Sequence, residues 1–80
     1  MIYRTKGVCS QAITVEVEND IITEVAFLGG CNGNTKGVAA LVKGMNVHEA
    51  INRLQGIKCG PRRTSCPDQL ATALKQCIGE

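Results

Sequence analysis

An alternating stretch near the start of the chain constrains the fold more than any other feature. The sequence "AITVEVE" at residues 12–18 places Ile13, Val15 and Val17 on one side of an extended chain. Threonine and glutamate fill the positions on the other side. This period of two predicts a strand with one buried face.

A second strand is expected directly after the first. Asn19 and Asp20 form a polar pair typical of a tight turn, and the stretch "IITEVAFL" at 21–28 is rich in β-branched residues. The two strands therefore form a predicted hairpin. Residues 1–3 are expected to add a short edge strand.

Two helices are expected after the hairpin. In "TKGVAALVKG" at 35–44, a helical period places Val38, Leu41 and Val42 on one face, and Gly44 suits the left-handed end of a helix. The stretch "NVHEAINRLQG" at 46–56 opens with a pair like a capping box, asparagine followed three residues later by glutamate. Its apolar residues also share one helical face.

A third helix is expected in "RRTSCPDQLATAL" at 62–74. Proline is favoured at the first helical position, so Pro67 predicts that Ser65 or Cys66 caps the helix. Leu70, Leu74, Cys77 and Ile78 then share its apolar face. Strands followed by helices imply an α+β fold, with a small antiparallel sheet of two or three strands packed against three helices. Residues 1–80 are expected to form a single domain.

The composition predicts that something besides the core stabilises this domain. A chain of 80 residues with only two aromatic residues buries roughly 60% of its unfolded surface, so a metal, a disulfide or a partner is expected. The net charge of +2 is spread along the chain, so nucleic acid is not an expected partner. Without a signal peptide or an apolar run long enough to span a membrane, the chain is predicted to be cytoplasmic. In that reducing compartment, cysteines favour metal binding or catalysis.

The five cysteines fall into two groups. Cys77 lies on a predicted apolar face and is expected to pack in the core. The other four lie before a strand, in two loops and at a helix start: Cys9, Cys31, Cys59 and Cys66. A helix start favours the thiolate form, which binds metal. From placement alone three interpretations stay open: a metal or cluster site, reduced thiols without a ligand, and redox or disulfide chemistry.

The polar residues offer weaker candidates. Arg62 and Arg63 are candidate contacts for an anion or a nucleotide, although solvated loop charges explain them as well. His48 is expected at the surface, and Asp68 complements the dipole of the third helix. Neither a catalytic triad nor a phosphate-binding loop occurs in the sequence. No catalysis by the chain itself is therefore expected.

Two blocks of sequence resemble the TSCPD domain family. The string "TSCPD" at 64–68 carries the motif that names the family, and "GGCNGNTKGVAALVKGM" at 29–45 is the second matching block. The resemblance implies a metal-binding module, with zinc held by Cys9, Cys31, Cys59 and Cys66. The family also occurs as the carboxy-terminal domain of some cobalamin-dependent ribonucleotide reductases. This implies, as the alternative, an accessory module of ribonucleoside-diphosphate reductase that acts in trans by thiol exchange or nucleotide binding.

The order of the elements also resembles the U-type scaffold proteins of iron-sulfur cluster assembly. In that comparison Cys9 precedes the hairpin, Cys31 follows it, and Cys66 opens the last helix. An iron-sulfur cluster is therefore the alternative to zinc, and a cluster- or metal-handling protein or a second copy of the chain is a candidate partner. The chain departs from the scaffolds by carrying Gln11 in place of an aspartate and Ser65 in place of a histidine, and Cys59 has no counterpart in them.

Overall fold

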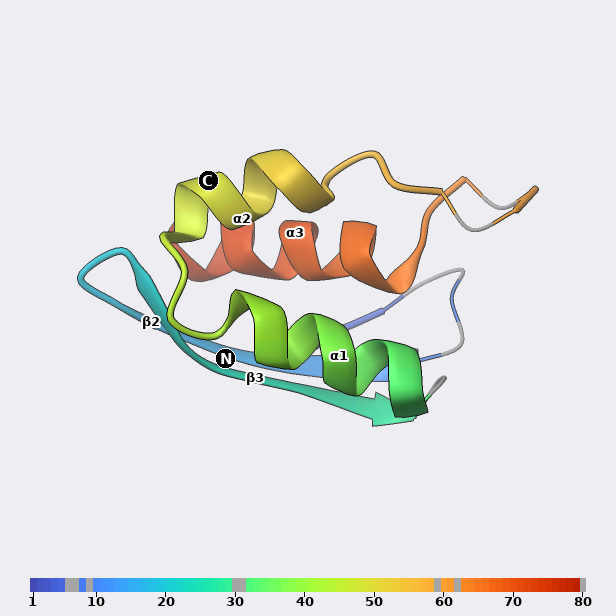
Figure 1. The fold of residues 1–80 in the computed structure, drawn as a ribbon, viewed down its shortest axis with the longest axis horizontal. Helices are drawn as coiled ribbons and strands as arrows, with labels where there is room; N and C mark the ends of the chain where they lie inside the picture. Colours follow the sequence, from blue (N-terminus) through green and yellow to red (C-terminus); the bar gives the residue numbers. More distant parts are fainter. Residues whose placement is uncertain (6–7, 9, 30–31, 59, 62, 80) are drawn as a thin grey trace.

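Three strands are followed by three helices along the chain. The structure is a computed structural model that describes residues 1–5, 8, 10–29, 32–58, 60–61 and 63–79. Its elements are β1 (Ile2–Arg4), β2 (Ser10–Glu18), β3 (Ile21–Gly29), α1 (Asn32–Val42), α2 (Val47–Leu54) and α3 (Cys66–Cys77). The helices lie on one side of the sheet, and α3 lies between α2 and the strands (Figure 1). The predicted α+β fold is thus confirmed.

The sheet is antiparallel with the strand order β1-β2-β3. Asn19 and Asp20 connect β2 to β3 with φ angles of 52° and 64°. Two positive φ angles match the right-handed twist of a two-residue hairpin, and asparagine and aspartate tolerate them better than most residues do. The tight turn predicted at these two positions is confirmed.

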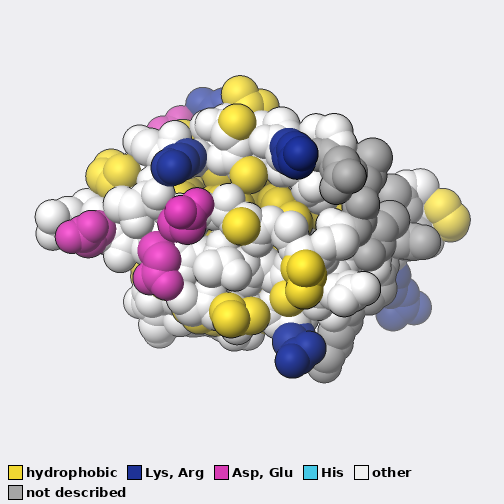
Figure 2. Space-filling model, turned by 90° about the horizontal axis from the view of Figure 1, so that it is seen from below, with side chains coloured by type: hydrophobic (Ala, Val, Ile, Leu, Met, Phe, Trp, Pro, Cys, Tyr) yellow, Lys and Arg dark blue, Asp and Glu magenta, His cyan; other side chains and the backbone are white. Residues whose placement is uncertain are grey.

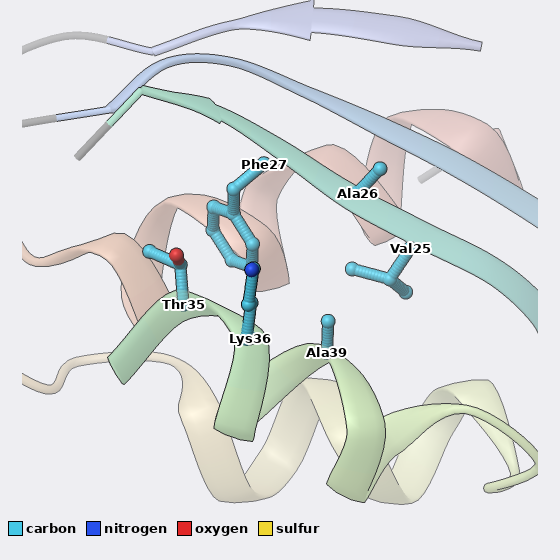
Figure 3. Close-up of a pocket in the computed structure, with 6 residues that line it drawn as sticks. All are labelled: Val25, Ala26, Phe27, Thr35, Lys36 and Ala39. Atoms are coloured by element: carbon cyan, nitrogen blue, oxygen red, sulfur yellow. The ribbon is translucent and has the colours of Figure 1, made fainter. Parts of the chain in front are cut away.

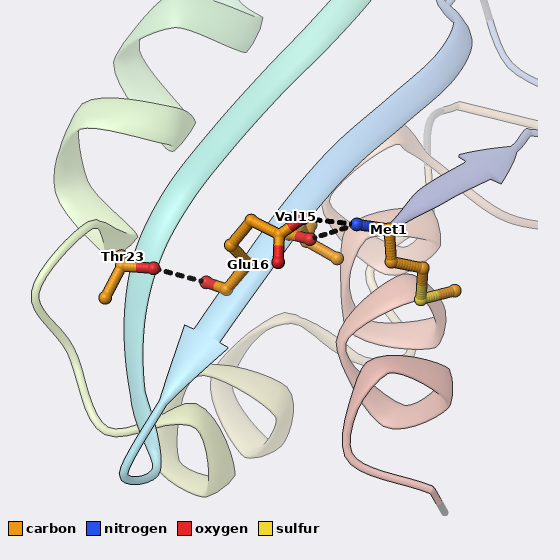
Figure 4. A network of polar contacts seen from close by, with 4 residues as sticks. All are labelled: Met1, Val15, Glu16 and Thr23. Atoms are coloured by element: carbon orange, nitrogen blue, oxygen red, sulfur yellow. Dashed lines mark hydrogen bonds and ion pairs between the residues drawn. The ribbon is translucent and has the colours of Figure 1, made fainter.

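The first residue ties β1 to the hairpin. The Met1 amino group donates a hydrogen bond to the Val15 carbonyl oxygen at 3.0 Å and forms an ion pair with Glu16 Oε1 at 2.5 Å. The Thr23 hydroxyl donates to the Glu16 carbonyl oxygen at 3.2 Å, so three segments meet here (Figure 4). The short edge strand β1 is therefore held by the contacts of Met1 as well as by its backbone hydrogen bonds with β2.

The hydrophobic core lies between the sheet and the helices. Ile13 and Val15 of β2 are fully buried, as the alternating pattern predicts. Leu70 and Leu74 of α3 are fully buried against them, while Cys77 is half-buried and packs against the same cluster. The predicted packing role of Cys77 is thus confirmed.

Backbone hydrogen bonds close the end of the molecule that holds the hairpin turn. Ile22 donates to the Met45 carbonyl at 3.0 Å and accepts from Gly44 at 2.7 Å, and Val47 donates to the Asp20 carbonyl at 2.8 Å. The Asn46 side chain caps α2 as predicted, because its oxygen accepts from the His48 and Glu49 amides at 2.9 and 3.3 Å. We call this region, residues 19–22 and 44–49, the hairpin end.

Two predictions for α1 are wrong. The helix begins at Asn32, inside the glycine-rich stretch and ahead of the predicted start at 35. Leu41 was expected on the buried face, yet 77% of it is exposed. Among the side chains of α1 that the structure describes, Thr35 and Val42 are buried, so the helix turns Leu41 away from the core.

The face of the sheet opposite the helices is open. It carries Ile2 and Leu28, which are 70% and 62% exposed. Figure 2 shows this side of the molecule, with apolar side chains set among basic and acidic ones. In the described ranges, no helix combines the length and the apolar character needed to cross a membrane.

Candidate metal site

Local sequence fixes the start of α3. Ser65 has extended backbone angles, and its hydroxyl accepts a hydrogen bond from the Asp68 amide at 3.1 Å, so this serine is the N-cap. Pro67 lies in the first turn, where the missing N–H costs no helical hydrogen bond. Cys66 is therefore the first residue of the helix, as its sequence context predicts.

The Cys66 side chain points into the molecule. It is 9% exposed, and its sulfur lies 3.3 Å from the hydroxyl oxygen of Ser10, where either group can donate the hydrogen bond. Ser10 is the first residue of β2 and is 4% exposed. The contact therefore brings the residue that follows Cys9 in sequence against the Cys66 thiol.

The register of the hairpin brings a third segment close to the contact between Ser10 and Cys66. Ser10 pairs with Gly29, the last residue of β3. Cys31 comes two residues later in the sequence, and α1 begins at Asn32 directly after it. Figure 1 shows the beginnings of β2, α1 and α3 at one end of the molecule, opposite the hairpin turn. We call this region, defined by Ser10, Gly29 and the first turns of α1 and α3, the Cys66 end.

The loop between α2 and α3 is anchored to the same helix start. The Ser65 hydroxyl donates to the Ile57 carbonyl at 2.7 Å, and the Gly56 amide donates to Asp68 Oδ1 at 2.6 Å. Asp68 is thus more than the first-turn charge that the sequence predicts, because it also holds the loop. Cys59 follows Ile57 by two residues in the sequence.

Buried polar side chains collect at the Cys66 end. Among the described residues, the buried polar side chains are Ser10, Thr35, Ser65 and Gln69. They belong to the first residue of β2, the first turn of α1, and the cap and first turn of α3. Each buried side-chain nitrogen or oxygen atom in the described part of the chain has a hydrogen-bond partner. The buried polar side chains at this end are therefore hydrogen-bonded, and the end is not an extension of the apolar core.

One of the four predicted metal ligands lies in the described part of the chain. Of the four candidate metal ligands, the structure describes Cys66, whereas Cys9, Cys31 and Cys59 lie outside the described residues. The residues that are described contain no group of three or more histidine, cysteine, aspartate or glutamate side chains arranged for a metal. The donor chemistry of Cys66 fits a metal that prefers sulfur, because a thiolate is the ligand that zinc and iron-sulfur clusters share.

Two of the remaining candidates, Arg63 and His48, lie at the surface. Arg63 is exposed, and Arg62 lies outside the described residues. His48 is exposed as predicted, with its Nε2 atom 3.8 Å from Asp20 Oδ1. Ser10 is the site residue that the sequence did not reveal. A short polar residue ahead of an alternating stretch carries no signal of burial, and its partner is 56 residues away.

The fold and this site define a small α+β domain with a thiol at the start of its last helix. The family model of the TSCPD domain matches residues 1–78. The chain therefore belongs to the TSCPD domain family, and the first resemblance is confirmed. No curated protein and no solved structure matches the chain, so the likeness to iron-sulfur scaffolds stays a prediction.

Proposed function

We propose that this TSCPD domain binds one zinc ion through the thiolates of Cys9, Cys31, Cys59 and Cys66, with an iron-sulfur cluster as the alternative occupant. The observation that carries the proposal is the buried contact between Ser10 Oγ and Cys66 Sγ at 3.3 Å. Together with the pairing of Ser10 and Gly29, it brings Cys66 close to residues that lie one position from Cys9 and two positions from Cys31 in the sequence.

Four thiolates suit a closed structural site. Zinc in such sites takes four ligands in a tetrahedral arrangement and leaves no position for a substrate. The ion would link the start of β2, the segment before α1, the loop after α2 and the start of α3. In a domain with a small core, the free energy of metal binding then appears as free energy of folding.

Basic residues near these cysteines in sequence support the charge balance. Four thiolates around a doubly charged ion leave a net charge of about −2, which is unfavourable in a partly buried place. Lys58 and Arg63 flank two of the proposed ligands in sequence, and both are exposed enough to keep their own charge solvated. Offsetting this negative charge would explain the arginines, so that no bound nucleotide is needed to account for them.

The first test is elemental analysis of protein purified anaerobically without a metal-binding tag, together with its visible absorption spectrum. We expect one zinc per chain and no visible absorption, whereas iron, sulfide and a brown colour would indicate the cluster. Cys66→Ser should lose most of the metal. Cys77→Ser is the matched control, because Cys77 packs on the far turn of the same helix. Absence of metal from the wild-type protein, or full occupancy in Cys66→Ser, would contradict the proposal.

The accessory role in ribonucleotide reduction stays a prediction from the family. It is tested separately, by titrating the folded chain with nucleoside diphosphates and by recovering partners from the native host. A stability shift with nucleotide that Arg63→Ala removes would support it. No shift, together with no recovered reductase subunit, would count against it.

A further inference from the structure

A pocket between β3 and α1 lies apart from the proposed metal site. It has a volume of about 270 Å³ and is lined by Val25, Ala26, Phe27, Thr35, Lys36 and Ala39. Figure 3 shows Val25 and Phe27 pointing from the strand toward the helix, while Lys36 extends from the helix toward the strand. We call it the β3–α1 groove. Three consecutive residues of β3 form one of its walls.

On the side away from β2, the backbone of β3 pairs with no other strand in the described part of the chain. Val15 exchanges hydrogen bonds with Met1, so its N–H and C=O point toward β1. In an antiparallel ladder such directions alternate, and the register partner Val25 therefore turns its own N–H and C=O away from β2, as does Phe27 two residues later. Outside the sheet ladder, no backbone hydrogen bond among the described residues involves either one. This edge offers the main-chain pattern that one more strand would complete.

The charge of the groove favours an incoming strand that carries an acidic side chain. Lys36 is the charged residue in the lining, and no acidic residue lines the pocket with it. Among the described residues, none of the ion pairs involves Lys36. An acidic group on the incoming strand would therefore meet an unpaired ammonium beside an apolar surface formed by Val25, Phe27 and Ala39.

A second copy of the chain is a poor occupant on the same grounds. Two β3 strands paired about a two-fold axis near Ala26 would present the same surface to each other. Both Lys36 side chains would then lie on one face of the joined sheet, close to the axis, without acidic groups from the lining of either groove to separate them. Like charges placed in this way oppose association.

We propose that the β3–α1 groove binds an extended segment of a partner protein, which pairs with the edge of β3, sets an apolar side chain against Phe27 and brings an acidic side chain to Lys36. The main-chain hydrogen bonds supply the affinity, and the pocket and Lys36 determine which side chains of the incoming strand are preferred. This proposal does not rest on the metal site, because none of the lining residues belongs to the Cys66 thiol contact.

Two synthetic peptides provide the test: TVEVEVT, and TVKVKVT as its charge-reversed match. Each is titrated at low salt into the isotope-labelled full chain, in the metal state in which it is purified, and amide shifts are followed by NMR. We expect shifts concentrated at residues 24–28 and 35–39, with the acidic peptide binding roughly two- to fivefold more tightly, the range that exposed ion pairs give.

The matched variants are Lys36→Glu and Lys75→Glu. Lys36 is exposed, so its replacement should leave the fold intact, which a thermal melt checks. Lys36→Glu should reverse the preference between the peptides, while Lys75→Glu on α3 should keep the wild-type order. Equal binding of the two peptides, shifts elsewhere in the chain, or no shift at millimolar peptide would overturn the proposal. The same would follow if raising the concentration of the chain alone produced these shifts, because a second copy would then fill the groove.

Discussion

The two ends of this molecule are built by different means. At the hairpin end, backbone groups of β3, the α1–α2 connection and α2 bind one another directly, through Ile22, Gly44, Met45 and Val47. At the Cys66 end, side chains make the connections, and the buried polar residues of the described chain gather there. The segments of the hairpin end are joined mainly by backbone groups, whereas those of the Cys66 end are joined by particular side chains.

Metal removal should separate the two ends most strongly. If a zinc ion links segments at the Cys66 end, a chelator should lower the melting temperature by more than about 10 °C, since each kcal/mol lost shifts a domain of this size by about 4–8 °C. In hydrogen exchange, protection should fall first at Ser10 and in the first turn of α3, and later at Ile22. An unchanged melting temperature after complete metal removal would contradict a structural ion.

Truncation of the core should affect both ends equally. Leu74 is fully buried against the sheet, so Leu74→Ala should lower the free energy of unfolding by about 2–5 kcal/mol, through lost burial and the cavity that remains. Chemical denaturation measures this change, and metal content is its control. Full metal content per folded chain is expected. Loss of metal from chains that are still folded would mean that packing of the core and metal binding at the Cys66 end are coupled.

The two helix caps offer the sharpest comparison. Asn46→Ala and Ser65→Ala each remove one N-cap, and each should cost about 1 kcal/mol of unfolding free energy. Ser65 also donates to the Ile57 carbonyl oxygen beside the loop of Cys59, so only Ser65→Ala should weaken metal binding as well. Competition with a chromogenic chelator measures that difference. Equal metal affinity in the two variants would show that the cap and the metal site are independent.

The smallest effect is expected at the edge strand. Glu16→Gln removes the ion pair with the Met1 amino group, but 58% of the Glu16 side chain is exposed, so the loss should stay within about 0.2–1 kcal/mol. The difference from wild type should shrink at 1 M salt, which screens exposed charges. A larger loss that is independent of salt would show that the hydrogen bonds, rather than the charge, hold β1.

Local signals in the sequence were sufficient for most of the fold. Alternation at 12–18, the turn at Asn19 and Asp20, and the caps at Asn46 and Ser65 each depend on neighbours within a few residues. Leu41 shows where such signals fail. An apolar residue at a helical period does not say which of two adjacent faces the sheet covers, and that choice depends on residues far along the chain.

The candidate site could be predicted only in part, for the same reason. The helix start at Cys66 is a local feature, and the sequence predicts it. Its contact with Ser10 depends on the register of β2 against β3 and on how α3 crosses the sheet, neither of which a local pattern records. Cys9, Cys31 and Cys59 lie outside the described residues, and metal binding by any of the four cysteines, Cys66 included, stays a prediction.

The separation of Ser10 and Cys66 also has a consequence for the order of folding. The hairpin joins residues that are close in sequence, and such contacts form early because little chain entropy is lost. The Ser10–Cys66 contact spans 56 residues, so we expect it to close late, with φ-values near zero for Ser10→Ala and higher ones in the hairpin. Until then the thiol remains open to the surroundings. A metal would therefore be captured at the last step of folding, when the sheet that receives it already exists.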